Sequence, residues 1–137
     1  MSGEACVIDA SVAIKLVITE PDSELADRLD GRRMLAPDLL WAECANILWK
    51  AARKGVVSAS EAELACEALL HLPFEITDSA VLLPAALRRA VALGHPAYDC
   101  LYLELAAREG VPLITADRRL SQLSVPDTRV IGLDSLA

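Results

Sequence analysis

Short apolar runs rich in β-branched residues alternate with longer helical stretches along the whole chain. The expected strands are residues 5–9, 33–36, 74–76, 111–115 and 129–132, and the expected helices are 11–18, 23–29, 37–54, 60–70, 79–93, 97–109 and 117–123. This alternation favours an α/β fold with a mostly parallel central sheet that helices cover on both faces. No repeat or linker interrupts the short connections, so we expect a single domain over residues 1–137.

The composition predicts a cytoplasmic protein without membrane contact. No apolar run reaches the ~18 residues that a membrane span needs, and the N-terminus lacks a basic segment followed by an apolar one. The cysteines show neither C-x-x-C nor zinc-ligand spacing, so we expect reduced structural thiols. They are Cys6, Cys44, Cys66 and Cys100.

The net charge of −7 argues against a nucleic-acid partner unless several carboxylates are gathered into one cation site. The basic residues are unevenly placed, and several occur in pairs. These pairs are Arg32-Arg33, Arg53-Lys54, Arg88-Arg89 and Arg118-Arg119. Such pairs are typical of solvated surfaces, but they can also make local contacts with phosphates.

Two aspartates occupy the same place in the strand-to-helix pattern. Asp9 directly follows the apolar residues 6–8, Asp117 follows the run 113–116, and each precedes an expected helix. In open α/β sheets, ligands bind just outside the carboxyl ends of the strands. If the two strands are neighbours in a parallel sheet, both carboxylates face one crevice.

Two further acids extend this pattern. Asp99 lies in the first turn of the expected helix 97–109, and Glu43 lies inside the expected helix 37–54. Crowded carboxylates cannot all stay ionised without a compensating charge, which a divalent cation supplies. Mg²⁺ and Mn²⁺ take oxygen ligands, orient phosphodiesters and activate water. The four acids, without a nucleophilic Cys, a Ser–His pair or a Gly-rich loop, therefore fit metal-assisted phosphodiester hydrolysis.

A purely structural interpretation stays open for each acid. Aspartate is a favoured N-cap, and acids in a first turn suit the helix dipole, which accounts for Asp9, Asp99 and Asp117 one at a time. Glu43 is not at a cap, but Asn46 and Lys50 follow at helical spacing, so a polar stripe facing solvent also explains it. Spacing alone leaves both interpretations standing.

Four segments, in order, resemble the acidic motifs of PIN-domain nucleases. They are Val7-Ile8-Asp9-Ala10-Ser11, Pro37-Asp38-Leu39 through Trp41-Ala42-Glu43-Cys44-Ala45-Asn46, the stretch 97–106 around Asp99, and Leu113-Ile114-Thr115-Ala116-Asp117. Their order, the chain length and the near end-to-end coverage are most similar to VapC-type toxins of toxin–antitoxin pairs.

The resemblance implies a three-layer α/β/α sandwich with a central parallel sheet and an endoribonuclease that depends on Mg²⁺ or Mn²⁺. The implied metal-binding and catalytic residues are Asp9, Glu43, Asp99 and Asp117. Asp9 and Asp99 are the implied principal ligands, and Ser11 and Thr115 the implied supporting residues. The resemblance also implies an RNA substrate, a homodimer and a cognate antitoxin that blocks the acidic pocket.

The alternative is a non-catalytic α/β module whose acidic pocket binds phosphate or a protein. A receiver-like domain has adjacent acids after its first strand and a late lysine, whereas Asp9 stands alone and no lysine follows Lys54. An aspartyl phosphatase favours a second Asp where this chain has Ser11. A dinucleotide-binding domain needs a G-x-G-x-x-G turn, which the chain lacks.

Overall fold

A five-stranded sheet, in which every strand runs parallel to its neighbours, forms the centre of the molecule. The structure is a computed structural model that describes residues 4–136, and its strand order is β3-β2-β1-β4-β5. The strands are β1 (Ala5–Ile8), β2 (Arg33–Pro37), β3 (Phe74–Thr77), β4 (Leu113–Thr115) and β5 (Val130–Gly132). The predicted parallel sheet is confirmed, and β1 is its central strand.

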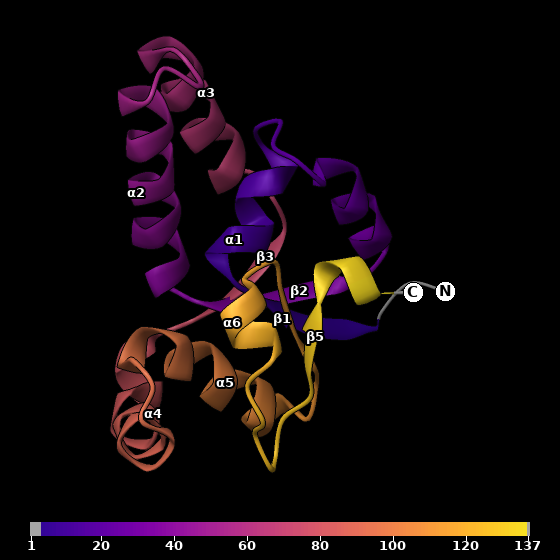
Figure 1. Cartoon of the computed structure of the whole chain (residues 1–137), viewed down its shortest axis with the longest axis vertical. Coiled ribbons are helices and arrows are strands. Elements are labelled where there is room, and N and C mark those ends of the chain that lie inside the picture. Colours follow the sequence, from indigo (N-terminus) through magenta and orange to yellow (C-terminus); the bar gives the residue numbers. More distant parts are fainter. Residues whose placement is uncertain (1–3, 137) are drawn as a thin grey trace.

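Helices cover both faces of this sheet. The α-helices are α1 (Ala10–Ala13), α2 (Leu39–Arg53), α3 (Ala59–Leu70), α4 (Ser79–Leu93), α5 (Ala97–Glu109) and α6 (Arg118–Ser121), and the 3₁₀ helices are η1 (Ile14–Leu16), η2 (Ser23–Leu29) and η3 (Leu133–Ser135). In Figure 1, α4 and α5 lie on one side of the sheet, and α1 and η2 lie on the other. The architecture is the three-layer α/β/α sandwich that the resemblance implied. None of the helices within residues 4–136 has the length and apolar character that a membrane span needs.

Burial explains why the central elements carry continuous apolar runs. Cys6, Val7 and Ile8 of β1 have no exposed surface, as expected for a strand covered on both faces. Helix α5 buries seven consecutive residues, from Cys100 to Ala106. It packs against β1, β2 and β4 on one side and α4 on the other, and a helix enclosed in this way is buried all round.

The register of the central strands brings their carboxyl ends together. Ile8 pairs with Ile114 across β1 and β4, so the next residues, Asp9 just after β1 and Thr115 at the end of β4, lie side by side. The first turn of helix α5 also lies at this end of the sheet, because the chain turns sharply between α4 and α5. Gly94 ends α4 with a positive φ of 63°, which glycine adopts without strain, and the chain then turns into α5.

Several expected elements differ in type or boundary. The expected helix 11–18 is a single α turn followed by η1, and 23–29 is a 3₁₀ helix throughout. The β-branched Val17 and Ile18 after η1 have low helix propensity. Pro37 is the last residue of β2 and not part of the first turn of α2.

The expected helix 60–70 begins one residue earlier in the structure, as α3 at Ala59, because its N-cap is Ser58. The S-x-x-E pattern of Ser60 and Glu63, on which the expected start was based, overlaps a second such pattern, and the capping box is formed by that second pair, Ser58 and Glu61. Ser58 has the extended backbone that an N-cap requires, with ψ at 164°. The prediction for the cysteines is confirmed in that all four are free thiols, three of them buried.

Candidate active site

Asp9 lies at the carboxyl end of β1 and caps α1. Its backbone is extended, and its Oδ1 accepts a hydrogen bond from the Val12 amide at 3.2 Å. The N-cap interpretation is therefore correct for Asp9. Capping does not account for its environment, however, because the residue is only 6% exposed and a buried carboxylate needs further polar partners.

Two hydroxyl groups supply these partners. Ser11 Oγ donates to Asp9 Oδ1, and Thr115 Oγ1 donates to Asp9 Oδ2, each at 2.5 Å. The same hydroxyls accept hydrogen bonds from the chain that leaves β4: the Ala116 amide bonds to Ser11 Oγ at 2.9 Å, and the Asp117 amide bonds to Thr115 Oγ1 at 3.0 Å. One network thus joins the ends of β1 and β4.

At Asp9, burial outweighs the hydrogen bonds, so the ionised carboxylate is destabilised when no cation is near it. Burial raises the pKa of Asp9 to about 6; the hydrogen bonds from Ser11, Thr115 and Val12 lower it, and the charge of Asp99 raises it further. The ionised form is therefore costly near neutral pH until a positive charge approaches.

Glu43 reaches the same region from α2. It is half-buried, and Tyr102 Oη of α5 donates a hydrogen bond to its Oε1 at 2.6 Å. Burial raises the pKa of Glu43, the hydrogen bond from Tyr102 opposes this, and the charge of Asp99 adds to it. Glu43 is thus not simply one member of a solvated stripe.

Asp99 lies in the first turn of α5, as expected. His95, in the turn that precedes the helix, places its Nε2 at 2.7 Å from Asp99 Oδ2. Asp99 keeps 29% of its side chain exposed, whereas His95 keeps 13%. The imidazole therefore fixes the orientation of the carboxylate, and the carboxylate stays accessible.

Asp117 caps α6. Its Oδ1 accepts hydrogen bonds from the amides of Arg119 and Leu120 at 2.8 and 3.4 Å. Unlike Asp9, Asp117 is exposed.

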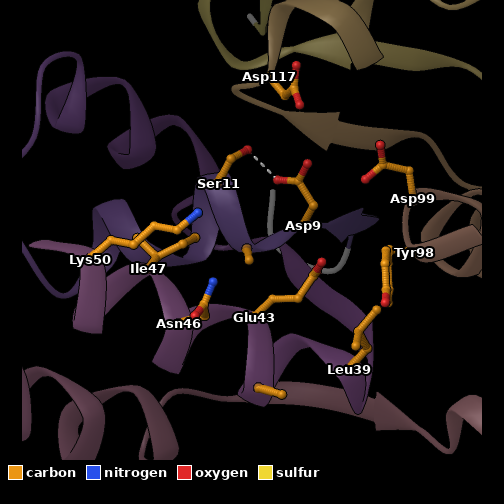
Figure 2. A pocket seen from close by; sticks show the side chains of 12 residues that line it. Asp9, Ser11, Leu39, Glu43, Asn46, Ile47, Lys50, Tyr98, Asp99 and Asp117 are labelled. Carbon is orange, nitrogen blue, oxygen red and sulfur yellow. Dashed lines mark hydrogen bonds between the residues drawn. The ribbon is translucent and has the colours of Figure 1, made fainter. Parts of the chain in front are cut away.

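The four acids line one cleft of about 440 Å³. Figure 2 shows the Asp99 carboxylate facing Asp9 and Glu43 extending toward the gap between them, with Asp117 on the other side of Asp9. The other lining residues are Ala10, Ser11, Leu39, Ala42, Asn46, Ile47, Lys50 and Tyr98. The structure therefore brings all four predicted acids to one cleft, and their roles as ligands remain predictions.

The arrangement of the acids limits how a cation could be held. Within residues 4–136, no three His, Cys, Asp or Glu side chains are gathered closely enough to hold one ion. Asp99 nevertheless acts electrostatically on both Asp9 and Glu43. Mg²⁺ is commonly held by one or two carboxylates, with waters and phosphate oxygens as the remaining ligands. The donor set fits such an open site better than a closed cage of four carboxylates.

Sequence reasoning did not assign Tyr102 and His95 to the site. Both lie one turn from Asp99, at the i+3 and i−4 positions, and this helical spacing is the signal that could have identified them. Asn46 and Lys50 are exposed, as expected of a polar stripe, but they also line the cleft.

Ion pairing separates structural arginines from available cations. Arg33 forms a salt bridge with the exposed Glu75 at 2.6 Å, and Arg89 bridges the buried Glu104 and the exposed Asp127 at 2.8 and 2.6 Å. Within the described residues, the side chains of Lys50, Arg118 and Arg119 form neither salt bridges nor hydrogen bonds. Arginines held in salt bridges are therefore structural, whereas cations without such partners are free either to face solvent or to contact phosphates.

Comparison with known proteins places this geometry in context. A family model described as PIN domain matches residues 6–126. The chain is similar to a curated protein named Ribonuclease VapC3 from Pyrobaculum aerophilum, with 34% identity over 120 residues that cover 85% of this chain and 92% of that protein.

Two solved structures share the fold. The crystal structure of PAE2754 from Pyrobaculum aerophilum has a TM-score of 0.74 and 27% sequence identity, covering 99% of this chain and 93% of that one. A toxin–antitoxin complex from Klebsiella pneumoniae contains a chain with a TM-score of 0.65 at 14% identity, covering 93% of this chain and 97% of that one. At that identity, the likeness concerns the fold alone.

Proposed function

Because the chain belongs to the PIN domain family, among its VapC-type members, we propose that it is an endoribonuclease that hydrolyses RNA phosphodiester bonds as the toxin of a toxin–antitoxin pair. The observation that carries this proposal is the cleft at the carboxyl ends of β1 and β4, where Asp9, Glu43 and Asp99 share one electrostatic environment. The name of the Pyrobaculum aerophilum relative, a ribonuclease, supports the choice of substrate.

We further propose that the cleft takes Mg²⁺ or Mn²⁺. Asp9 and Asp99 are the proposed principal ligands, and Glu43 and Asp117, which line the same cleft, are proposed to add negative charge and further ligand oxygens around this open site. Carboxylate oxygens are the hard donors that both ions prefer. When bound, a divalent ion supplies positive charge that orients the scissile phosphate, stabilises the leaving oxygen and lowers the pKa of the attacking water.

The neighbouring side chains keep these carboxylates in position. Ser11 and Thr115 donate hydrogen bonds to Asp9, which favours its ionised form. His95 orients Asp99, and Tyr102 orients Glu43. Partners of this kind strengthen metal sites because they fix the direction of each ligand.

The test is RNA cleavage by the purified protein. We expect cleavage in Mg²⁺ or Mn²⁺, loss of cleavage in chelator, and loss of cleavage in Asp9→Asn and Asp99→Asn. Asp27→Asn is the matched control because Asp27 is exposed and lies outside the cleft. Undiminished cleavage in chelator or in both site variants would contradict the metal-site proposal. RNA or phosphate binding without any cleavage would favour the non-catalytic module.

We also propose a cognate antitoxin and a homodimer as partners. The fold shared with a chain of a toxin–antitoxin complex supports the antitoxin. Support for a second copy comes from the outer face of α4, where apolar side chains are 51% to 78% exposed, a feature common at protein interfaces; they are Val81, Leu83, Leu87 and Val91. Light scattering tests the dimer, and co-purification with the product of the adjacent gene tests the antitoxin.

A further inference from the structure

Helix α2 carries a row of polar side chains from the cleft to its C-terminal end. Glu43, Asn46, Lys50 and Arg53 follow one another at intervals of three or four residues, so they share one side of the helix. The first three line the cleft. At ~1.5 Å per residue, Arg53 lies roughly 15 Å beyond Glu43 along the helix axis. The row thus begins with an acid of the site and ends with a cation, Arg53, outside the cleft.

Trp49 lies beside this row and is exposed. Its exposed fraction is 55%, whereas Trp41 on the same helix is half-buried and packs against Phe74, with ring centroids 5.8 Å apart. The guanidinium carbon of Arg53 lies 5.5 Å from the centroid of the Trp49 ring. An indole ring is stabilised when it is buried, but more than half of Trp49 is exposed. Packing in the core therefore does not explain a tryptophan at this position.

The cations at this end of α2 are available to an outside partner. Within residues 4–136, Lys50, Arg53 and Lys54 make no side-chain hydrogen bond or salt bridge, and the Arg53 guanidinium lies over the Trp49 ring. Three cations therefore occur within five residues of a chain whose net charge is −7. This local positive charge beside the acidic cleft is complementary to a polyanion.

We propose that the C-terminal half of α2 binds a single-stranded segment of the RNA substrate, with Trp49 stacking on an unpaired base and Lys50 and Arg53 contacting the adjacent phosphates. The inference rests on the proposed function, because it places the strand beside the phosphodiester that the acids hydrolyse. Exposed aromatic rings flanked by cations are the general means by which proteins hold single strands. These three residues are positioning residues and not catalytic ones.

Fluorescence tests the stacking directly. The chain has two tryptophans, so Trp41→Phe leaves Trp49 as the only indole, and Asp9→Asn in the same protein prevents cleavage. We expect a short unstructured RNA to quench Trp49 emission saturably, and an abasic strand of equal length to quench it much less. If Trp41→Phe does not fold, the difference between Asp9→Asn and Asp9→Asn/Trp49→Phe gives the same signal.

Affinity measurements test the contribution of each group. In the Asp9→Asn protein, Trp49→Ala is expected to weaken binding of the same RNA by about 5- to 100-fold, and Trp49→Phe by much less. Lys50→Gln is expected to reduce the slope of log K against log salt by about 0.7. Leu70→Ala and Arg88→Gln are the matched controls, since Leu70 of α3 and Arg88 of α4 are exposed and lie outside the cleft.

The outcomes separate this proposal from the proposed function. RNA affinity that is unchanged in Trp49→Ala, together with unquenched Trp49 emission, would overturn the binding site even if the protein cleaves RNA. Absence of cleavage by the unmodified protein would instead overturn the proposed function. A Trp49→Ala protein that binds RNA normally but loses a co-expressed antitoxin would show that this surface binds protein, which also rejects the proposal.

Discussion

Two strand-to-helix junctions carry an aspartate in the same sequence context, yet they give it opposite environments. After β1, Asp9 is buried, both of its oxygens accept hydrogen bonds, and burial raises its pKa to about 6. After β4, Asp117 is exposed and caps α6 through Oδ1. The difference arises because β1 is the central strand, so that α2, α5 and β4 surround its end. N-capping and a role in the site are therefore compatible, and burial distinguishes the two aspartates.

The largest expected effect is on RNA cleavage. Asparagine caps a helix about as well as aspartate, so Asp9→Asn and Asp117→Asn remove charge with little loss of capping. We expect Asp9→Asn to reduce the initial rate at least about 100-fold, because its charge lies at the centre of the cleft, and Asp117→Asn to reduce it about tenfold or less. Equal losses in the two variants would show that the junctions contribute alike.

The free energy of unfolding should change in the opposite direction from cleavage: Asp9→Asn is expected to raise it, although the same change reduces cleavage most. The pKa of Asp9 is about 6 in the folded protein against an ordinary value of 3.8, so the contribution of Asp9 to the stability of the metal-free protein is greatest below the ordinary value and falls as pH rises through this interval. Asp9→Asn removes that penalty, which is roughly 2 to 3 kcal/mol at neutral pH. Asp117→Ala should instead cost about 1 kcal/mol through the lost cap.

Urea unfolding in chelator measures both free energies, at neutral pH and near pH 3.8, the ordinary pKa of aspartate. At the lower pH, the advantage of Asp9→Asn should largely disappear. An advantage that persists there would mean that burial of the ionised carboxylate is not its cause.

The hydroxyl shared by the two junctions offers a finer test. Thr115 donates to Asp9 and accepts from the Asp117 amide, so Thr115→Val removes both contacts without a large change in shape. Cleavage and metal affinity should fall by about 10- to 100-fold, as for other groups that orient metal ligands. Thr115→Ser keeps the hydroxyl and should retain most activity, so similar losses in the two variants would reject an orienting role.

The smallest effect concerns pH. Because cations bind the ionised carboxylate, protons compete with them at Asp9 below its pKa of about 6. Mn²⁺ affinity, measured by calorimetry, should therefore fall by up to about tenfold for each pH unit below that value and level off above it. In Asp9→Asn this part of the pH dependence should be absent.

Local sequence pattern predicted much of the fold. The apolar runs that became β1 and β4 are continuous because both faces of these strands are buried, and Gly94 and Gly110 mark helix ends. The edge at which the acids meet could be predicted as well, since ligands gather at the carboxyl ends of parallel strands. The errors lie at boundaries such as Ser58, where two overlapping capping patterns differ only in tertiary context.

The contacts that shape the cleft could not be predicted in this way. Tyr102 and Glu43 are 59 residues apart in sequence, and their hydrogen bond depends on how α2 and α5 pack. The rotation of α2 about its axis also decides whether Lys50 faces open solvent or the cleft, and helical spacing does not determine that rotation. The residue pattern and the family resemblance both predicted the four acids as site residues, but neither assigned Tyr102 or His95 to the site.

The strand order also has a consequence for a chain that is still being translated. Asp9 is made among the first residues, but the Thr115 hydroxyl that holds its Oδ2 is 106 residues away, and β4 must join β1 before they meet. Since domains fold as units as they emerge from the ribosome, the cleft cannot be completed until most of the chain is made. Under the proposed function, a ribosome synthesising this protein is not exposed to an active nuclease from its own unfinished product, and messages truncated before β4 yield harmless fragments.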